Sequence, residues 1–178
     1  LGLVNVGFSM LFGGISGSST SDTASIGSVL IPEMRRRGYP AGFAAGLTVA
    51  SSTMGMVIPP SIPLVIFAVT AQESVGRLFL GGVVPGLMVG FFQLALVFVI
   101  ARRRAYPKEE IEFSVGLVWQ QLLRSGVVLA MPLVVVGTVV FGIATATESA
   151  ALGVTYALLV GAFLIRHLSF SDVIPSLR

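Results

Sequence analysis

Two short polar stretches hold most of the side chains that could bind or react with a ligand. The first, Gly13–Asp22, reads GGISGSSTSD and carries five hydroxyl groups and one carboxyl group. The second, Ser51–Pro63, reads SSTMGMVIPPSIP. Glycine and proline interrupt helices and leave backbone carbonyl groups unpaired, and small hard cations prefer carbonyl, hydroxyl and carboxylate oxygens as ligands. We expect the two stretches to form one polar binding site.

The same breaks could also bind an anion. A helix that begins after a break points the positive end of its dipole at the cavity, which favours a carboxylate. Asp22 has two compatible interpretations: it lies on an ion or proton path, or it is the N-cap of the helix that follows the first break. Ser51, Ser52 and Thr53 could instead bond back to their own helical turn. The residue types alone leave these alternatives open.

Two other function classes use similar residues. Gly14–Gly17 is a G-x-S-G string of the kind found in intramembrane serine proteases, but such an enzyme needs a general base near the serine. The only histidine, His167, follows the last apolar stretch and is expected at the surface, as is Glu148. A channel could use the same carbonyl groups, although two interrupted helices fit a closed substrate site better than a continuous pore.

The composition indicates an all-α integral membrane protein. Hydrophobic residues make up 54% of the 178 residues and charged residues 11%, whereas a soluble domain carries roughly 25% charged residues. Arginines cluster at 35–37 and 102–104, and the positive-inside rule places both clusters on the cytoplasmic side. Because sequence suited to a lipid environment separates the clusters, we expect lipid and no nucleic acid as a partner.

The order of breaks and apolar runs predicts the membrane topology. A glycine- and serine-rich tip at 17–19 predicts a re-entrant hairpin whose ends share the side of the arginine cluster, and Pro59, Pro60 and Pro63 predict two half-helices, 41–57 and 62–70. The chain starts without Met and enters apolar sequence at once, so we expect a piece of a longer protein. The expected segments are a re-entrant hairpin at 1–37, a broken transmembrane helix and a following transmembrane helix at 38–104, a cytoplasmic interfacial helix at 105–125, and two transmembrane segments at 126–178.

Several motifs together resemble one family, the large membrane subunit of tripartite ATP-independent periplasmic (TRAP) transporters, the DctM-like permeases. The stretch TATESAA at 145–151 resembles a TPTEAAA segment of that family, with Ala146 where proline is usual. The other matching stretches are GISGSSTSDTASIGS at 14–28, IPEMRRRGY at 31–39, ASSTMGMVIPPSIP at 50–63 and LFLGGVVPG at 78–86.

The resemblance implies a Na⁺-driven secondary transporter in the inner (cytoplasmic) membrane of a bacterium or archaeon. Its cargo would be an organic acid, such as a C4-dicarboxylate or a sugar acid, and Na⁺ would be the coupling ion, with no other cofactor. Its partners would be a small membrane subunit and a periplasmic substrate-binding protein. The fold would be an elevator type built of inverted repeats, with 126–178 starting the second repeat. Without the rest of that repeat, we do not expect this piece to transport alone.

Carried over by motif, the resemblance assigns the site to the hairpin tip and the helix break. The implied Na⁺ ligands are Ser18, Ser19 and Gly55. Asp22 would support these ligands from behind or cap the helix that follows. The full set of implied binding residues is Ser16, Gly17, Ser18, Ser19, Asp22, Ser52, Thr53, Gly55, Pro59, Pro60 and Ser61.

Overall fold

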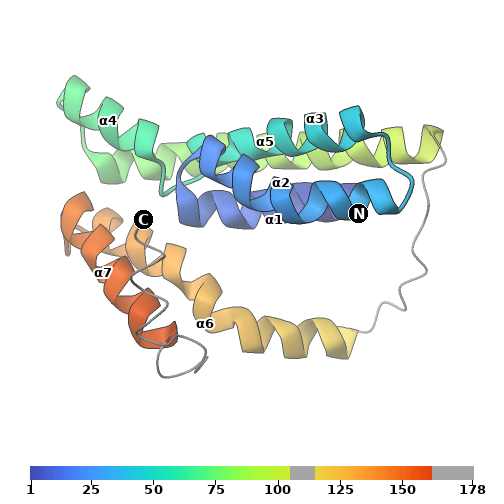
Figure 1. The fold of residues 1–178 in the computed structure, drawn as a ribbon. Coiled ribbons are helices and arrows are strands. Elements are labelled where there is room, and N and C mark those ends of the chain that lie inside the picture. Colours follow the sequence, from blue (N-terminus) through green and yellow to red (C-terminus); the bar gives the residue numbers. More distant parts are fainter. Residues whose placement is uncertain (105–114, 162–178) are drawn as a thin grey trace. The chain divides into compact units, whose positions relative to one another are not determined.

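The described part of the chain is helical throughout, and no strand occurs in it. The computed structural model describes residues 1–104 and 115–161, except for the side chains of residues 115, 117–125 and 128. The chain divides into two compact units, Leu1–Glu112 and Phe113–Arg178. The predicted all-α class is confirmed. Figure 1 shows the helices of each unit.

The first unit begins with a helical hairpin. Helix α1 (Gly2–Ser16) ends at Gly17, whose φ of 62° is the left-handed conformation that glycine adopts at little cost. Helix α2 (Ser19–Arg36) then starts from the N-cap Ser18. With 15 residues, α1 is about 22 Å long, shorter than a bilayer core of about 30 Å. The turn therefore lies at the predicted tip, between two arms of which the first is too short to span.

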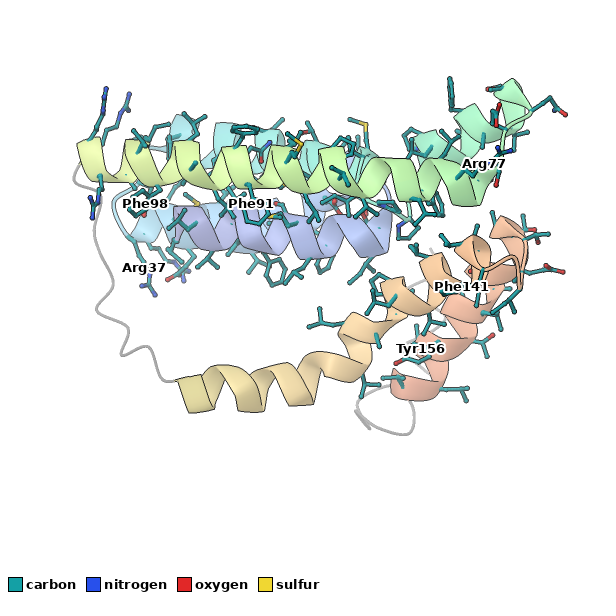
Figure 2. All side chains as sticks on the ribbon, turned by 180° about the vertical axis from the view of Figure 1, so that it is seen from behind. Arg37, Arg77, Phe91, Phe98, Phe141 and Tyr156 are labelled. Carbon is teal, nitrogen blue, oxygen red and sulfur yellow. The ribbon has the colours of Figure 1, made fainter. Side chains whose placement is uncertain are left out.

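Both ends of the hairpin lie at the same end of the unit. Leu1 packs against the buried cluster of Met34, Tyr39 and Ala44, which lies where α2 meets the next helix. Arg37 marks this end of the unit in Figure 2, and Arg77 lies at the opposite end. The basic cluster and the mixed-charge loop therefore occupy opposite ends, as the predicted topology requires.

The second element is a broken helix. Helix α3 (Ala41–Ser52) tightens into the 3₁₀ turn η1 (Thr53–Met56), and helix α4 (Ile62–Ala71) begins after the N-cap Ser61. The regular α-helix therefore ends at Ser52, five residues before the predicted end of the first half. Gly55 is a poor helix former and the prolines that follow cannot continue the helix, which explains the early end. In Figure 1, α4 extends past the hairpin tip.

Helix α5 (Val75–Arg103) is the scaffold of the first unit. It is the one helix among the described residues that is long and apolar enough to cross a membrane. Shorter apolar helices are α1, α4 and Leu129–Val140. The α5 glycines let other elements come close: a Cβ on Gly82 would lie 2.8 Å from the Val57 carbonyl oxygen, and one on Gly86 would lie 2.7 Å from Ile58 Cγ1. Side chains such as Phe91 project from the helix (Figure 2).

The second unit is a helix pair, α6 (Val115–Val140) and α7 (Ala146–Leu159). Polar contacts join the pair: the Ser149 hydroxyl bonds to Thr138 Oγ1 at 2.5 Å and donates to the Val135 carbonyl at 2.7 Å. Thr145 and Glu148 form a capping box, so the predicted joint is kept although Ala146 stands where the family usually has proline.

The structure differs from the predicted segments at one boundary in this unit. We expected an interfacial helix to end at residue 125, but α6 runs through that position without a break. The apolar pattern changes there, yet no helix-breaking residue occurs at 125, so the backbone continues. Residues 105–114 of that predicted helix, and His167, lie outside the described residues.

Candidate functional site

The hairpin tip and the helix break come together in the first unit. The Ile62 backbone N–H donates to the Gly17 carbonyl over 3.2 Å. A Cβ on Gly17 would lie 2.8 Å from the Pro60 carbonyl oxygen, and a Cβ on Gly13 would lie 3.0 Å from the Gly55 Cα. Only glycine permits such close approach of two backbones. The two predicted stretches are therefore adjacent, although more than thirty residues separate their starts.

Asp22 is fully buried beneath the tip. The Ser16 hydroxyl donates to its Oδ1, and Ser16 Oγ also accepts from the Ser18 backbone N–H over 3.2 Å. The other oxygen, Oδ2, has no hydrogen-bond partner and faces Gly55, where an added Cβ would collide with it. The N-cap of α2 is Ser18. The interpretation of Asp22 as a cap is therefore wrong, since Asp22 lies four residues into the helix and points at the break.

The hydroxyl side chains of the break point in different directions. Ser52 is fully buried, and its Oγ has no hydrogen-bond partner. Thr53 is exposed and donates to the Ala50 carbonyl over 2.7 Å, so its hydroxyl bonds back to its own helix. The alternative of an ordinary helical hydroxyl thus describes Thr53 but not Ser52. Thr53 does not point at the buried oxygens of Asp22 and Ser52.

The remaining predicted site residues build two helix starts beside each other. Ser18 accepts from the Ser21 N–H at the start of α2, and Ser61 accepts from the Leu64 N–H at the start of α4, each over 3.5 Å. Ser61 also donates to the Met56 carbonyl over 2.6 Å, which closes the loop that contains Pro59 and Pro60. Ser19 is the half-buried first residue of α2. The bond between Gly17 and Ile62 places both N-termini at the tip.

Two polar features near the site were missed from the sequence. Asn5, Ser9, Thr48 and Ser51 are fully buried and hydrogen bonded between α1 and α3. Ser51 belongs to the predicted polar stretch, but Asn5, Ser9 and Thr48 stand singly within apolar helices and were missed. The spacing of four residues on α1 and three on α3 puts each pair on one helix face, which was the available signal. The second feature is Gln93 of α5, whose Nε2 donates to the Ala50 carbonyl over 3.0 Å and whose Oε1 has no partner.

A cation at this site would have to use mixed oxygen ligands. Among the described residues, no group of three or more His, Cys, Asp or Glu side chains could hold a metal ion. The oxygens available beside the break are the Asp22 carboxylate, the Ser16 and Ser52 hydroxyls and the backbone around Gly55. Such a set suits a hard cation that binds weakly and reversibly.

Comparison with known proteins decides the family. The profile described as "Tripartite ATP-independent periplasmic transporter, DctM component" matches residues 1–178. The chain belongs to the DctM family. It is 38% identical over 169 residues to the isethionate TRAP transporter permease protein DctMQ of Oleidesulfovibrio alaskensis, covering 95% of this chain and 27% of that protein.

Two further relatives carry other substrates in their names. The chain is 33% identical over 176 residues to the sialic acid TRAP transporter permease protein SiaT of Haemophilus influenzae, covering 99% of this chain and 28% of SiaT. It is 35% identical over 170 residues to the C4-dicarboxylate TRAP transporter large permease protein DctM of Pseudomonas aeruginosa, covering 92% of this chain and 38% of that protein. The chain thus spans between about a quarter and two fifths of the length of these relatives.

The DctM family is a family of permeases and not of enzymes. The serine in the G-x-S-G string is Ser16, and in the structure its hydroxyl donates to the Asp22 carboxylate at the end of α1. The family membership therefore removes the protease hypothesis, and the structure gives Ser16 a different role beside the buried carboxylate.

Proposed function

We propose that this chain is part of the large membrane subunit of a TRAP transporter that imports an organic acid across the inner (cytoplasmic) membrane, coupled to Na⁺. Support for the cargo comes from the relatives, whose names give isethionate, sialic acid and C4-dicarboxylate. All three are acids that are anionic at neutral pH. The small membrane subunit and the periplasmic binding protein are proposed as partners on the same family basis.

One observation carries the proposal of a cation site: two fully buried oxygens, Asp22 Oδ2 and Ser52 Oγ, have no hydrogen-bond partner. A buried carboxylate with one oxygen left without a partner is costly in an apolar environment, so it favours binding of a cation. Na⁺ would find there one carboxylate, one hydroxyl and the carbonyl groups of the break around Gly55. Ser18 and Ser19 remain predicted ligands at the tip.

The two helix starts support an anionic cargo. Helices α2 and α4 begin at adjacent points, joined by the bond between Gly17 and Ile62, and α4 has no acidic residue in its first turn, whereas α2 carries Asp22 there. Each N-terminus carries a partial positive charge of roughly half an elementary charge. A carboxylate held there would lie near a bound Na⁺, so each ion would strengthen binding of the other.

The coupling is energetically adequate. Each Na⁺ that enters down a potential of about 100 mV contributes roughly 2.3 kcal/mol. Two such ions that enter with a monoanionic cargo carry one net positive charge inward, so the potential supplies about 2.3 kcal/mol, which corresponds to a roughly fiftyfold accumulation of the cargo. Binding of cation and carboxylate in one site would make this coupling obligatory.

The test is uptake of labelled organic acids into proteoliposomes that contain the full-length permease and its small membrane subunit, with the cognate binding protein outside. We expect uptake to require both an inward Na⁺ gradient and the binding protein. Asp22→Asn keeps the shape and the contact with Ser16 but removes the charge, and it should abolish Na⁺ dependence.

The control is Glu33→Gln, which removes the other carboxylate of α2, one that is partly exposed and paired with Arg37. This variant should transport like the wild type. Flux that ignores both Na⁺ and the binding protein would contradict the proposal and favour a channel. Unchanged Na⁺ dependence in Asp22→Asn would remove Asp22 from the site.

A further inference from the structure

A second polar cluster lies between α1 and α3, outside the site described above. Its members are Asn5 and Ser9 on α1 and Thr48 and Ser51 on α3, and all four are fully buried. We call these four residues the polar seam. Polar side chains between apolar helices are expensive in a membrane unless each finds a partner.

Every member of the polar seam has such a partner. Asn5 Nδ2 donates to Thr48 Oγ1 over 2.8 Å, and Asn5 Oδ1 accepts from the Ser51 hydroxyl over 3.3 Å. The Ser9 and Ser51 hydroxyls bond to each other over 2.8 Å. Thr48 donates in turn to the Ala44 carbonyl over 2.9 Å. Asn5 is the centre of the seam because it uses both ends of its amide, one on each of two α3 residues.

The polar seam fixes the register of α1 against α3. Asn5 and Ser9 lie one turn apart on α1, and Thr48 and Ser51 lie one turn apart on α3. The pairs Asn5–Thr48 and Ser9–Ser51 can therefore both form in only one register of the two helices. A slide of α1 along α3 by one residue would displace the two members of each pair by about 1.5 Å and break their hydrogen bonds. Loss of this match would leave several donors and acceptors without partners.

The seam leads directly to the buried oxygens. One turn after Ser9 comes Gly13, on which an added Cβ would lie 3.0 Å from the Gly55 Cα. Directly after Ser51 comes Ser52, whose hydroxyl has no partner. The same register that satisfies the seam therefore brings Ser52 and Gly55 to the tip of the hairpin, where Asp22 lies.

We propose that Asn5, Ser9, Thr48 and Ser51 are positioning residues that set the Na⁺ affinity of the site by holding α1 and α3 in register, without touching the ion or the cargo. This inference rests on the proposed function. The seam satisfies its own hydrogen bonds, whereas Asp22 Oδ2 and Ser52 Oγ keep theirs open for a ligand. The hydrogen-bonded polar seam thus lies next to two oxygens that have no hydrogen-bond partner.

A seam that only joined the helices would have a different signature. Its loss would lower the stability of the permease and leave the Na⁺ affinity of the folded molecules unchanged. A positioning role moves that affinity in molecules that are folded and in the membrane. The experiment must therefore measure occupancy of the site and not transport rate alone.

The occupancy probe is a single cysteine at Met56, an exposed residue of the 3₁₀ turn directly after Gly55. This chain has no cysteine, so Met56→Cys in a cysteine-free full-length permease gives one thiol. The rate of its reaction with a membrane-impermeant maleimide is measured in proteoliposomes at increasing NaCl, with choline chloride balancing the ionic strength. The Na⁺ concentration that gives half of the maximal change in labelling rate, the half-effect concentration, reports the affinity.

Thr48→Val removes the hydroxyl at nearly constant shape, and Thr48→Ser keeps it. Thr70→Val is the matched control, because the Thr70 hydroxyl bonds only to carbonyls of its own helix and is exposed. We expect Thr48→Val, which loses the one hydrogen bond to Asn5, to raise the half-effect concentration between about threefold and about twentyfold, the range for one interhelical hydrogen bond in a membrane. Thr48→Ser and Thr70→Val should stay within about twofold of the Met56→Cys parent.

The outcomes separate the two proposals. Labelling of the Met56→Cys parent that ignores Na⁺ overturns the proposed Na⁺ coupling and the positioning role together. Labelling that responds to Na⁺ with the same half-effect concentration in Thr48→Val overturns the positioning role alone. If Thr48→Val does not accumulate in the membrane, Ser9→Ala decides, because it leaves Asn5 with both partners. A smaller shift in the same direction supports the role, and no shift overturns it.

Discussion

Substitution of Gly55 by alanine is the sharpest perturbation of the site. The added Cβ would collide with Asp22 Oδ2 and lie 3.5 Å from the Gly13 Cα, so backbone stands on one side and the buried carboxylate on the other. Overpacking of this kind costs about 1–3 kcal/mol. Because Gly55 has an ordinary negative φ, alanine adds no backbone strain, and its better helix propensity offsets up to about 1 kcal/mol.

The cost falls mainly on the ion-bound state, since the methyl group occupies space beside the carboxylate. The loss that remains after this offset, up to about 2 kcal/mol, lowers Na⁺ affinity by up to about thirtyfold. The assay is the Na⁺ concentration for half-maximal uptake in proteoliposomes with the full-length permease, beside its melting temperature with and without Na⁺. Gly55→Ala should lose most of the stabilisation that Na⁺ gives to the wild type.

Gly46→Ala is the control within the same segment. Gly46 lies in α3, and an added Cβ would meet nothing within 4 Å in the described structure. This variant should bind Na⁺ like the wild type and melt at the same or a slightly higher temperature. If Gly55→Ala keeps the wild-type Na⁺ response, or if Gly46→Ala loses as much, the close approach of Asp22 and Gly55 does not build the site.

Three further substitutions test other parts of the structure. Ser52→Ala removes a buried hydroxyl that has no partner, so the melting temperature should stay equal or rise while Na⁺-dependent uptake falls, whereas Ser28→Ala should change neither uptake nor melting. Gly82→Ala should lower the free energy of unfolding by about 1–3 kcal/mol, and Gly81→Ala, where an added Cβ meets nothing within 4 Å, should not, as judged by thermal melting in detergent. Hydrogen bonds from the backbone and side chain of Thr145, the N-cap of α7, hold the pKa of Glu148 below its usual value of 4.5. The stabilisation of α7 by the Glu148 carboxylate is therefore complete above pH 4.5 and is lost as the pH falls through the lowered pKa. The melting temperatures of wild type and Glu148→Gln should therefore differ at neutral pH and converge as the pH falls below 4.5, and a gap that does not narrow in acid would contradict this origin.

The sequence predicted the elements of the fold where the deciding residues act locally. Gly17 ends α1 because it can adopt a positive φ, the prolines at 59 and 60 lie between the halves of the broken helix, and Pro63 lies in the first turn of α4. These effects depend on the residue itself and its immediate neighbours. That is why the hairpin tip was predicted in the correct place without any knowledge of packing, whereas the end of the first half of the broken helix was predicted five residues too late.

The roles within the site could not be read in the same way. Asp22 was a candidate cap because it follows the break, but Ser18 already fills that position, and the direction of the Asp22 carboxylate depends on Gly55 from a distant part of the chain. Ser52 and Thr53 are neighbours of similar chemistry, yet one is buried and the other exposed. Which of Ser52 and Thr53 is buried depends on how α3 is oriented against the helices that it packs on. The polar seam escaped notice for the same reason, because its members meet across two helices.

The hydrogen bond from Ile62 to Gly17 has a mechanical consequence. It ties the turn of the hairpin to the first residue of α4 by backbone atoms, so among substitutions at position 62 only proline removes the donor. A hairpin that swung open alone would leave a donor and an acceptor unpaired, at a cost of several kcal/mol each in an apolar environment. We therefore expect the hairpin tip and the start of α4 to move together whenever either of them moves.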